Sequence, residues 1–310
     1  MITRRTMLAG TVAALLFALG TPAMAQTTFD TSGAQAGRPH TKAGESAKLL
    51  EGKNLLLEPG KLVIAMSPYV PPTSFYADDA KTVIGFNADL ITLVAEKLGL
   101  QPDIRVVAFP DWPLSIESHK YDVFIGSTTV TEERKLKFDF SAYSRDLAAF
   151  FVAADSPITK ITESADIAGI KLIVASGTVA EKIVLDWDAQ NKAAGLKPVE
   201  LQYFDDPAAA EISLRSGRSD AQFVGNYAEG AYNAAVSGQT RLVGFVGSWN
   251  GADAVTGVVT KKDSGMAEPI CAAIDEIIAD GTYQAALDRW GMSDAAIKKS
   301  TVNPPGLVIK

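Results

Sequence analysis

The chain has 310 residues, of which 47% are hydrophobic and 21% charged, with a formal net charge of −7. These values are typical of a folded globular protein of one large or two medium domains, and they exclude a disordered or fibrous chain. Because lysine and arginine gather in no basic tract, we expect no nucleic-acid partner.

Residues 1–25 have the features of a cleavable secretory signal. The pair Arg4-Arg5 precedes a short apolar run at 8–19, and Ala23-Met24-Ala25 supplies the small residues of a cleavage site. We therefore expect a periplasmic protein, exported by the Sec route or, because of the arginine pair, by the twin-arginine route. Gln26 follows the cleavage point where a lipoprotein would need a cysteine, so no lipid anchor is expected.

Cysteine and histidine are scarce. Cys271 is the only cysteine, so no internal disulfide is possible, and its apolar helical surroundings predict a small buried side chain. His40 and His119 stand alone, without a cysteine beside them. We expect no metal site and no cofactor.

The remaining chain alternates between strand and helix patterns. Residues 26–59 are rich in Thr, Ser, Gly and Ala, and we expect a mobile leader there. A helical stripe from Phe86 to Leu98 follows a buried strand at 62–65. Further strands are expected at 104–107, 123–125, 172–174, 199–204, 221–224, 242–245 and 255–260. This alternation predicts an α/β protein with parallel sheets covered by helices.

Helices are expected between the later strands. One has Ile183, Val184 and Trp187 inward, and a second runs from Pro207 to Gly217, with Asp206 as its cap. Two more helices, at 270–278 and 282–290, close the chain. The pattern forms two α/β units and a tail, and a cleft between two such units is a usual place for a small ligand.

Five fragments, in order and spacing, resemble one known family. The chain from Lys61 to about Gly306 is similar to the amino-acid-type periplasmic solute-binding proteins, family 3 of the bacterial extracellular solute-binding proteins, which are the substrate-binding components of ABC transporters. The fragments are Gly85–Leu90 (GFNADL), His119–Val123 (HKYDV), Thr129–Ser141 (TVTEERKLKFDFS), Gly217–Ala221 (GRSDA) and Asp280–Gly291 (DGTY…RWG).

The resemblance implies a fold and partners. The fold is that of a type II periplasmic binding protein, with two α/β lobes joined by two crossing strands and a ligand cleft between them. Lobe 1 would comprise 60–150 and 248–310, and lobe 2 would comprise 151–247. The implied partners are a small-molecule ligand and the ABC permease subunits of the inner membrane, and the implied state is a monomer.

The resemblance also implies a site for a carboxylate. Arg134 occupies the position whose guanidinium grips the ligand's α-carboxylate with two parallel hydrogen bonds. Without the motif, Arg134 would be interpreted as a surface residue paired with Glu132 or Glu133. Ser127 and Thr129, at the end of a strand, would offer a backbone carbonyl and a hydroxyl.

Lobe 2 would complete this site. Ser176, Thr178 and Val179 form a turn between a strand and a helix, where exposed amides attract anions. The same turn is also an ordinary helix cap.

Aromatic rings are expected around the rest of the ligand. Tyr69 and Phe109 fall where the family places rings that sandwich the ligand's side chain or amine, and Phe75 and Trp112 are close alternatives. The other interpretation for each is an ordinary core aromatic residue.

One departure concerns the ligand's amine. Many members have an aspartate about five residues after the Gly-Arg-x-Asp aspartate, where this chain has Gly225 followed by Asn226. An amide can hydrogen-bond an ammonium but cannot neutralise it. Asn226, Tyr227 or Asp205 would substitute, so the ligand is either an amino acid held differently or a carboxylate without a free α-amine.

The sequence thus predicts a periplasmic binding protein without catalytic activity, whose ligand is a polar amino acid or a related small carboxylate or amine. One alternative is a dehydratase-like periplasmic enzyme on the same fold, which would need a carboxylate or histidine in the cleft. The expected lining contains neither, and Asp205 would have to approach it to supply a carboxylate. The other alternative is a ligand-binding sensor component.

Overall fold

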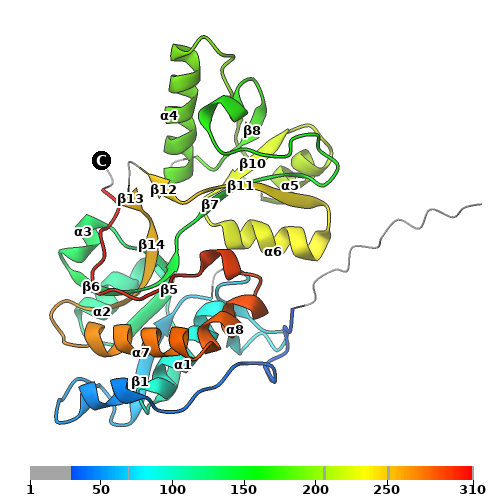
Figure 1. Ribbon diagram of the computed structural model, residues 1–310. Coiled ribbons are helices and arrows are strands. Elements are labelled where there is room, and N and C mark those ends of the chain that lie inside the picture. Colours follow the sequence, from blue (N-terminus) through cyan, green and yellow to red (C-terminus); the bar gives the residue numbers. More distant parts are fainter. Residues whose placement is uncertain (1–28, 69, 177, 205–206, 250–251, 309–310) are drawn as a thin grey trace, which may run out of the picture.

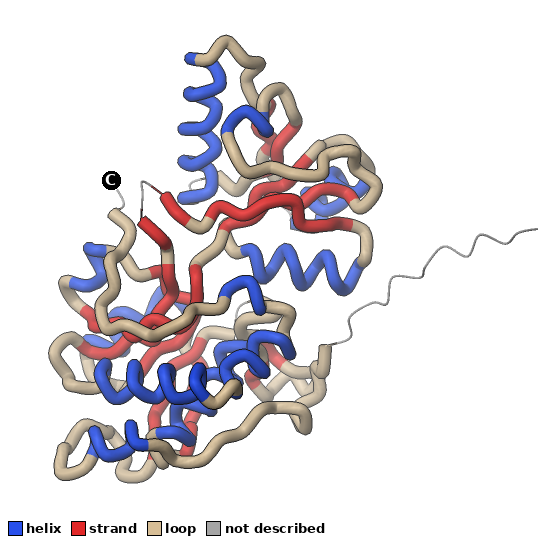
Figure 2. The backbone as a smooth tube through the Cα atoms, viewed as in Figure 1, coloured by secondary structure: helices blue, strands red, loops and turns tan. Residues whose placement is uncertain are grey.

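The computed structural model describes residues 29–68, 70–176, 178–204, 207–249 and 252–308. The expected signal at 1–25 lies outside these residues. The described chain forms two five-stranded sheets, each with helices packed on it (Figures 1 and 2). This arrangement confirms the predicted α/β class.

The first sheet has the strand order β4-β1-β5-β14-β6, and both of its faces are buried. Alternate residues of β1 point to opposite faces: Leu62 and Ile64 join one apolar cluster, Val63 and Ala65 another, and all four are fully buried. The strands are β1 (Lys61–Met66), β4 (Gln101–Val106), β5 (Val123–Thr129), β6 (Phe138–Arg145) and β14 (Val255–Lys261). The first three are parallel, and β14 runs antiparallel to β5 and β6.

The second sheet has the order β11-β7-β10-β8-β9. Strands β8 (Lys171–Ile173), β9 (Glu200–Gln202) and β10 (Ala221–Val224) pair in parallel, and β7 (Ala148–Ala153) runs antiparallel to both of its neighbours, β10 and β11 (Thr240–Val246). Its helices are α4 (Val179–Ala193), α5 (Pro207–Arg215) and α6 (Tyr227–Ser237). Helix α6 lies on the side of this sheet that faces the first sheet (Figure 1).

Around the first sheet lie the remaining elements. The α-helices are α1 (Phe86–Lys97), α2 (Trp112–Glu117), α3 (Glu132–Lys135), α7 (Ala267–Ala279) and α8 (Thr282–Arg289). A small hairpin is formed by β2 (Phe75–Tyr76) and β3 (Val83–Ile84). The 3-10 helices are η1 (Glu45–Leu50), η2 (Phe109–Asp111), η3 (Ser164–Ile167), beside the second sheet, and η4 (Ser293–Ala295).

The chain passes between the two sheets twice. It leaves the first sheet at the end of β6 and enters β7 through Asp146 and Leu147. It returns from β11 to β14 through the hairpin of β12 (Ser248–Trp249) and β13 (Ala252–Asp253). The amide of Asp146 donates to the carbonyl of Ala254 at 2.8 Å, so the two connections are hydrogen-bonded to each other.

Residues 29–59, where the sequence predicts a mobile leader, contact the helices of the first sheet. Helix η1 packs on α7, where the amide of Ser46 donates to Glu276 at 2.8 Å and its hydroxyl donates to the same carboxylate at 3.0 Å. The ring of Phe29 lies parallel to that of Trp290, with centroids 6.1 Å apart. Polar composition suggested mobility, but these individual contacts with distant residues hold the segment on the first sheet's helices.

We expect Phe29→Ala to lower the free energy of unfolding by about 1 to 2 kcal/mol, since the half-buried ring loses aromatic contacts to Tyr232, 4.8 Å away, and to Trp290. Urea denaturation of the ligand-free protein measures this change. Phe29→Leu, which keeps apolar volume, should lose less. If wild type and both variants were equally stable, the contacts of Phe29 would not stabilise the fold, and a mobile leader would remain the better description of this segment.

Candidate functional site

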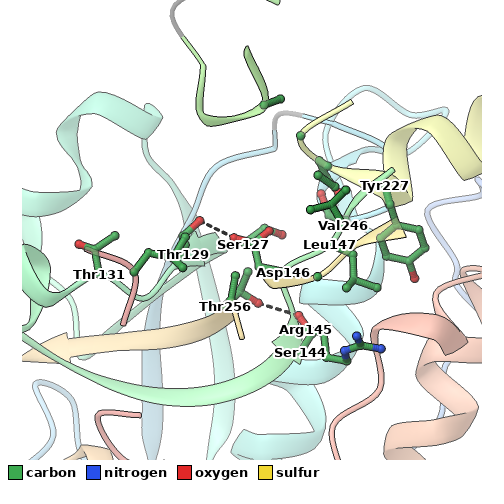
Figure 3. A pocket seen from close by; sticks show the side chains of 18 of the residues that line it. Ser127, Thr129, Thr131, Ser144, Arg145, Asp146, Leu147, Tyr227, Val246 and Thr256 are labelled. Carbon is green, nitrogen blue, oxygen red and sulfur yellow. Dashed lines mark hydrogen bonds between the residues drawn. The ribbon is translucent and has the colours of Figure 1, made fainter. Parts of the chain in front are cut away.

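A pocket of about 340 Å³ lies where the two sheets are connected. Its lining includes residues of β5, α3, β6 and β14 around the first sheet and residues of β7, α4, α6 and β11 around the second. Asp146, Leu147, Gly247 and Ala254, from the two connections, line it as well. Figure 3 shows its polar residues converging from several elements. The pocket therefore draws on segments far apart in the sequence.

Arg134 lines this pocket and is held from two sides. Thr131 caps α3, with its hydroxyl accepting a hydrogen bond from the amide of Arg134 at 3.1 Å. Nη1 of Arg134 donates to the carbonyl of Thr129 at 2.8 Å, and the guanidinium lies 5.9 Å from the ring centroid of Trp112. Burial lowers the pKa of Arg134, but an arginine keeps its charge at neutral pH.

The surface-pair interpretation of Arg134 is not supported. Glu132 pairs with Lys135 at 2.9 Å, and Arg134 forms no ion pair with another described residue. A fixed, partly buried guanidinium without a carboxylate partner is suited to binding an anion from outside the chain.

Asp146 is a charged pocket residue that the sequence does not predict. Its carboxylate accepts a hydrogen bond from the hydroxyl of Thr129 at 2.6 Å, drawn as a dashed line in Figure 3. Burial raises the pKa of this carboxyl, while the hydrogen bond from Thr129 and the charge of Arg134 act against that rise. The two charges thus influence each other through the pocket, with Thr129 contacting both.

Ser127, on the pocket wall, has strained backbone geometry. Its φ of 51° lies in the left-handed region, which is uncommon for a residue other than glycine. The hydroxyl of Tyr143 accepts from the amide of Ser127 at 3.0 Å and donates to the side chain of Asn87 at 3.0 Å. Because burial raises the pKa of Tyr143 to about 12, this hydroxyl stays neutral and the arrangement is fixed.

A second pocket of about 390 Å³ adjoins the first. It shares Thr73, Ser127 and Asn226 with the first pocket and also contains Phe109. The ring of Phe109 is 37% exposed and meets Phe124 edge-on, with centroids 6.1 Å apart. A side chain extending from the first pocket would therefore reach an aromatic wall.

The other aromatic candidates lie elsewhere. Trp112 is 3% exposed and stacks on Phe124 at 5.3 Å between centroids, so it is a core residue behind Arg134. Phe75 packs against Trp290, with centroids 5.6 Å apart, and belongs to neither pocket. Tyr69 lies outside the described residues.

The predicted turn before α4 is not among the described lining of either pocket. Thr178 caps α4, with its hydroxyl accepting from the amide of Glu181 at 3.1 Å and donating to the carbonyl of Ala175 at 2.7 Å. Ser176 is exposed, and Val179 begins the helix. The helix-cap interpretation therefore describes Thr178, and the next turn of α4 reaches the first pocket through Ala180.

Asn226 lines both pockets and is also a helix cap. Its side-chain oxygen accepts a hydrogen bond from the amide of Ala228 at 3.2 Å, at the start of α6. The adjacent Tyr227 packs its ring against Phe245, with centroids 5.4 Å apart. Asp205, the third candidate for the ligand's amine, lies outside the described residues.

No group of three or more histidine, cysteine, aspartate or glutamate side chains among the described residues is placed to hold a metal ion. No helix of the described chain is long and apolar enough to span a membrane.

Comparison with known proteins gives consistent results. The family model described as bacterial extracellular solute-binding proteins, family 3, matches residues 62–293. The L-cystine-binding protein TcyJ of Escherichia coli K12 is 30% identical over 266 residues, which cover 81% of this chain and 91% of that protein. The arginine-binding protein ArgT of Corynebacterium glutamicum is 25% identical, with 80% of each chain covered.

A similar structure is that of an ancestral arginine-binding protein bound to arginine. It is 29% identical, with a TM-score of 0.53, and the match covers 74% of this chain and 98% of that one.

Proposed function

The chain belongs to family 3 of the bacterial extracellular solute-binding proteins, and on that premise we propose that it is the periplasmic binding component of an ABC importer for an amino acid. A signal at residues 1–25 would direct its export, and the mature protein would work as a monomer that delivers its ligand to permease subunits in the inner membrane. The relatives named for cystine and arginine binding support an amino acid as the ligand.

The ligand is proposed to bind in a cleft between two lobes. Residues 60–150 and 248–310 would form one lobe around the first sheet, and residues 151–247 the other around the second. The composition of the pocket supports this, since its lining comes from elements of both sheets and from both connections. Closure of the lobes would bend those connections around the ligand.

Arg134 carries this proposal. Its guanidinium faces the pocket with no carboxylate of the described chain paired to it, so a ligand carboxylate would supply the missing partner. Ser127 and Thr129 would add hydrogen bonds from the same wall, and Ser176, Thr178 and Val179 would approach from lobe 2 on closure. The ligand's side chain would extend toward Phe109, with Tyr69 as its proposed second aromatic neighbour.

An enzyme on the same fold is the competing function, and Asp146 is the observation that favours it. Burial raises the pKa of the Asp146 carboxyl, and a raised pKa of this kind is typical of a general acid or base in an active site. Against catalysis, the matched family consists of solute-binding proteins. Incubation with a bound amino acid, followed by mass spectrometry, separates the two: recovery of unchanged ligand fits a binding protein, and a product fits an enzyme.

We expect the protein's melting temperature to rise with L-cystine, L-arginine or L-histidine, since a ligand bound only by the folded state stabilises it. At a ligand concentration one hundred times Kd, the gain is about 2.7 kcal/mol. Differential scanning fluorimetry against the standard amino acids measures this, and isothermal titration calorimetry gives the stoichiometry. Glucose serves as the control. An unchanged melting temperature with every amino acid would contradict the proposed ligand class.

A further inference from the structure

We propose that Asp146 binds the ligand's ammonium group, so that the ligand is an amino acid with a free α-amine rather than a carboxylate without one. This inference deepens the proposed function and rests on it. Asp146 lies on the first connection between the sheets. It does not correspond to the aspartate that binds the amine in many family members, since that position is Gly225 in this chain.

The first step is the placement of opposite charges around one residue. Thr129 donates its hydroxyl proton to Oδ2 of Asp146 at 2.6 Å, and its carbonyl accepts from Nη1 of Arg134 at 2.8 Å. The guanidinium and the carboxylate form no ion pair with each other. An α-amino acid carries its two charges on groups attached to one carbon, so its carboxylate and ammonium fit between these two side chains.

The second step concerns the other candidates for the ammonium. The oxygen of Asn226 already accepts from the backbone of α6, and a neutral amide cannot neutralise an ammonium. Tyr227 is 2% exposed and packed on Phe245. Of the charged residues in the described lining, Arg134, Arg145 and Asp146, only Asp146 is an anion. Among the described lining residues, Asp146 is therefore the only carboxylate with which a bound ammonium could form an ion pair.

The third step is energetic. A carboxylate in a poorly solvated site is costly unless a cation or several hydrogen bonds compensate it. Within the described chain, the side chain of Asp146 has one hydrogen bond, from Thr129, and burial raises the pKa of its carboxyl. A bound ammonium would supply the missing compensation and lower that pKa again. The pocket is thus preorganised for a cation next to Asp146.

The test compares ligands that differ only in their amines. Titration calorimetry of wild type and Asp146→Asn uses L-cystine with 3,3′-dithiodipropionate, and L-arginine with 5-guanidinopentanoate. We expect Asp146→Asn to weaken binding of the amino acid that wild type binds by about 30-fold or more. Binding of its amine-free partner should change by less than about threefold. Asp155→Asn, an exposed site after β7, controls for the loss of one negative charge.

Each result is decisive. Equal losses for both members of a pair, or no loss for either, would overturn the role of Asp146 and leave the proposed function standing. Failure of wild type to bind any amino acid would overturn the proposed function and this inference together. Circular dichroism and the melting temperature of ligand-free Asp146→Asn establish that the variant is folded.

A pH titration adds an independent readout. Wild-type affinity for the amino acid should fall as the pH falls through the raised pKa of Asp146, because protonation removes the charge that the ammonium meets. The charged and titratable groups facing Asp146 are Arg134 of α3, and Arg145 and Tyr143 of β6. Burial raises the pKa of Tyr143, so a fall in pH leaves this hydroxyl neutral, and the guanidinium of Arg134 stays charged. The fall should be absent in Asp146→Asn. The same fall in both proteins would contradict the inference.

Discussion

Arg134→Ala is expected to weaken amino-acid binding about a hundredfold to a thousandfold. Removing one partner of a buried charge pair costs about 2 to 5 kcal/mol, since the remaining ligand carboxylate is left without its cation. The guanidinium is oriented before the ligand arrives, by Thr129 and by the face of Trp112, so the loss includes preorganised geometry as well as charge. Titration calorimetry with the amino acid that stabilises wild type measures the change.

Two further variants define the cause. Arg134→Lys keeps a positive charge but loses the planar fork, so we expect an intermediate loss. Arg218→Ala, in an exposed loop after α5, removes a charge of the same kind and should leave affinity unchanged. Since Arg134 packs on Trp112, unfolding of the ligand-free variant must be measured as well. A folded Arg134→Ala protein with wild-type affinity would contradict the proposed carboxylate site.

Elements such as β1, β8 and α7 are predictable because their signals are local. Buried strands such as β1 and β8 are short unbroken apolar runs, and α7 has a complete apolar stripe. The sequence does not predict α6. Its residues are mostly small or polar, and the cap that starts it, Asn226, was interpreted as a ligand group. One asparagine side chain can both cap a helix and contact a ligand, and the sequence does not distinguish these two roles.

The candidate site was predictable only in part. Ser127, Thr129 and Arg134 lie close together in the sequence, at or next to a recognisable fragment, so the sequence predicts that they share a site. In the structure, all three line the same pocket. Asp146 carries no such signal. Its place in the pocket depends on the connection between β6 and β7, and its partner Thr129 is 17 residues away on another strand. Contacts that depend on topology in this way are invisible to periodicity and composition.

The fragment Gly85–Leu90 is a second case in which contacts between distant residues cannot be predicted from the sequence, although the fragment itself is recognisable. It resembles a feature of the family, but the sequence assigns no role to it. In the structure, Asp89 is fully buried and accepts hydrogen bonds from Arg38, Arg289 and the indole of Trp290. These partners lie 51, 200 and 201 residues away along the chain. The recognised aspartate is thus a structural centre that joins the N-terminal segment, α1 and the end of α8.

Asp89→Ala is accordingly expected to lower the free energy of unfolding by about 3 to 5 kcal/mol. Removing one partner of a buried ionic network leaves the others without compensation, and here two arginines and an indole lose their acceptor. The donor–acceptor distances are 2.7 Å for Arg38, 2.6 Å for Arg289 and 2.8 Å for Trp290, so all three hydrogen bonds are well formed. Urea denaturation of the ligand-free protein measures the loss.

Asp30→Asn provides the matched control, because Asp30 also contacts Arg289, at 3.3 Å, but from an exposed position. Solvent screens such pairs, so its effect should be far smaller. Asp89→Asn, which keeps one oxygen acceptor, should fall between the two. If Asp89→Ala were no more destabilising than Asp30→Asn, the buried network would not be what fixes the N-terminal segment on α1 and α8. The aromatic contacts of Phe29 would then have to account for its position.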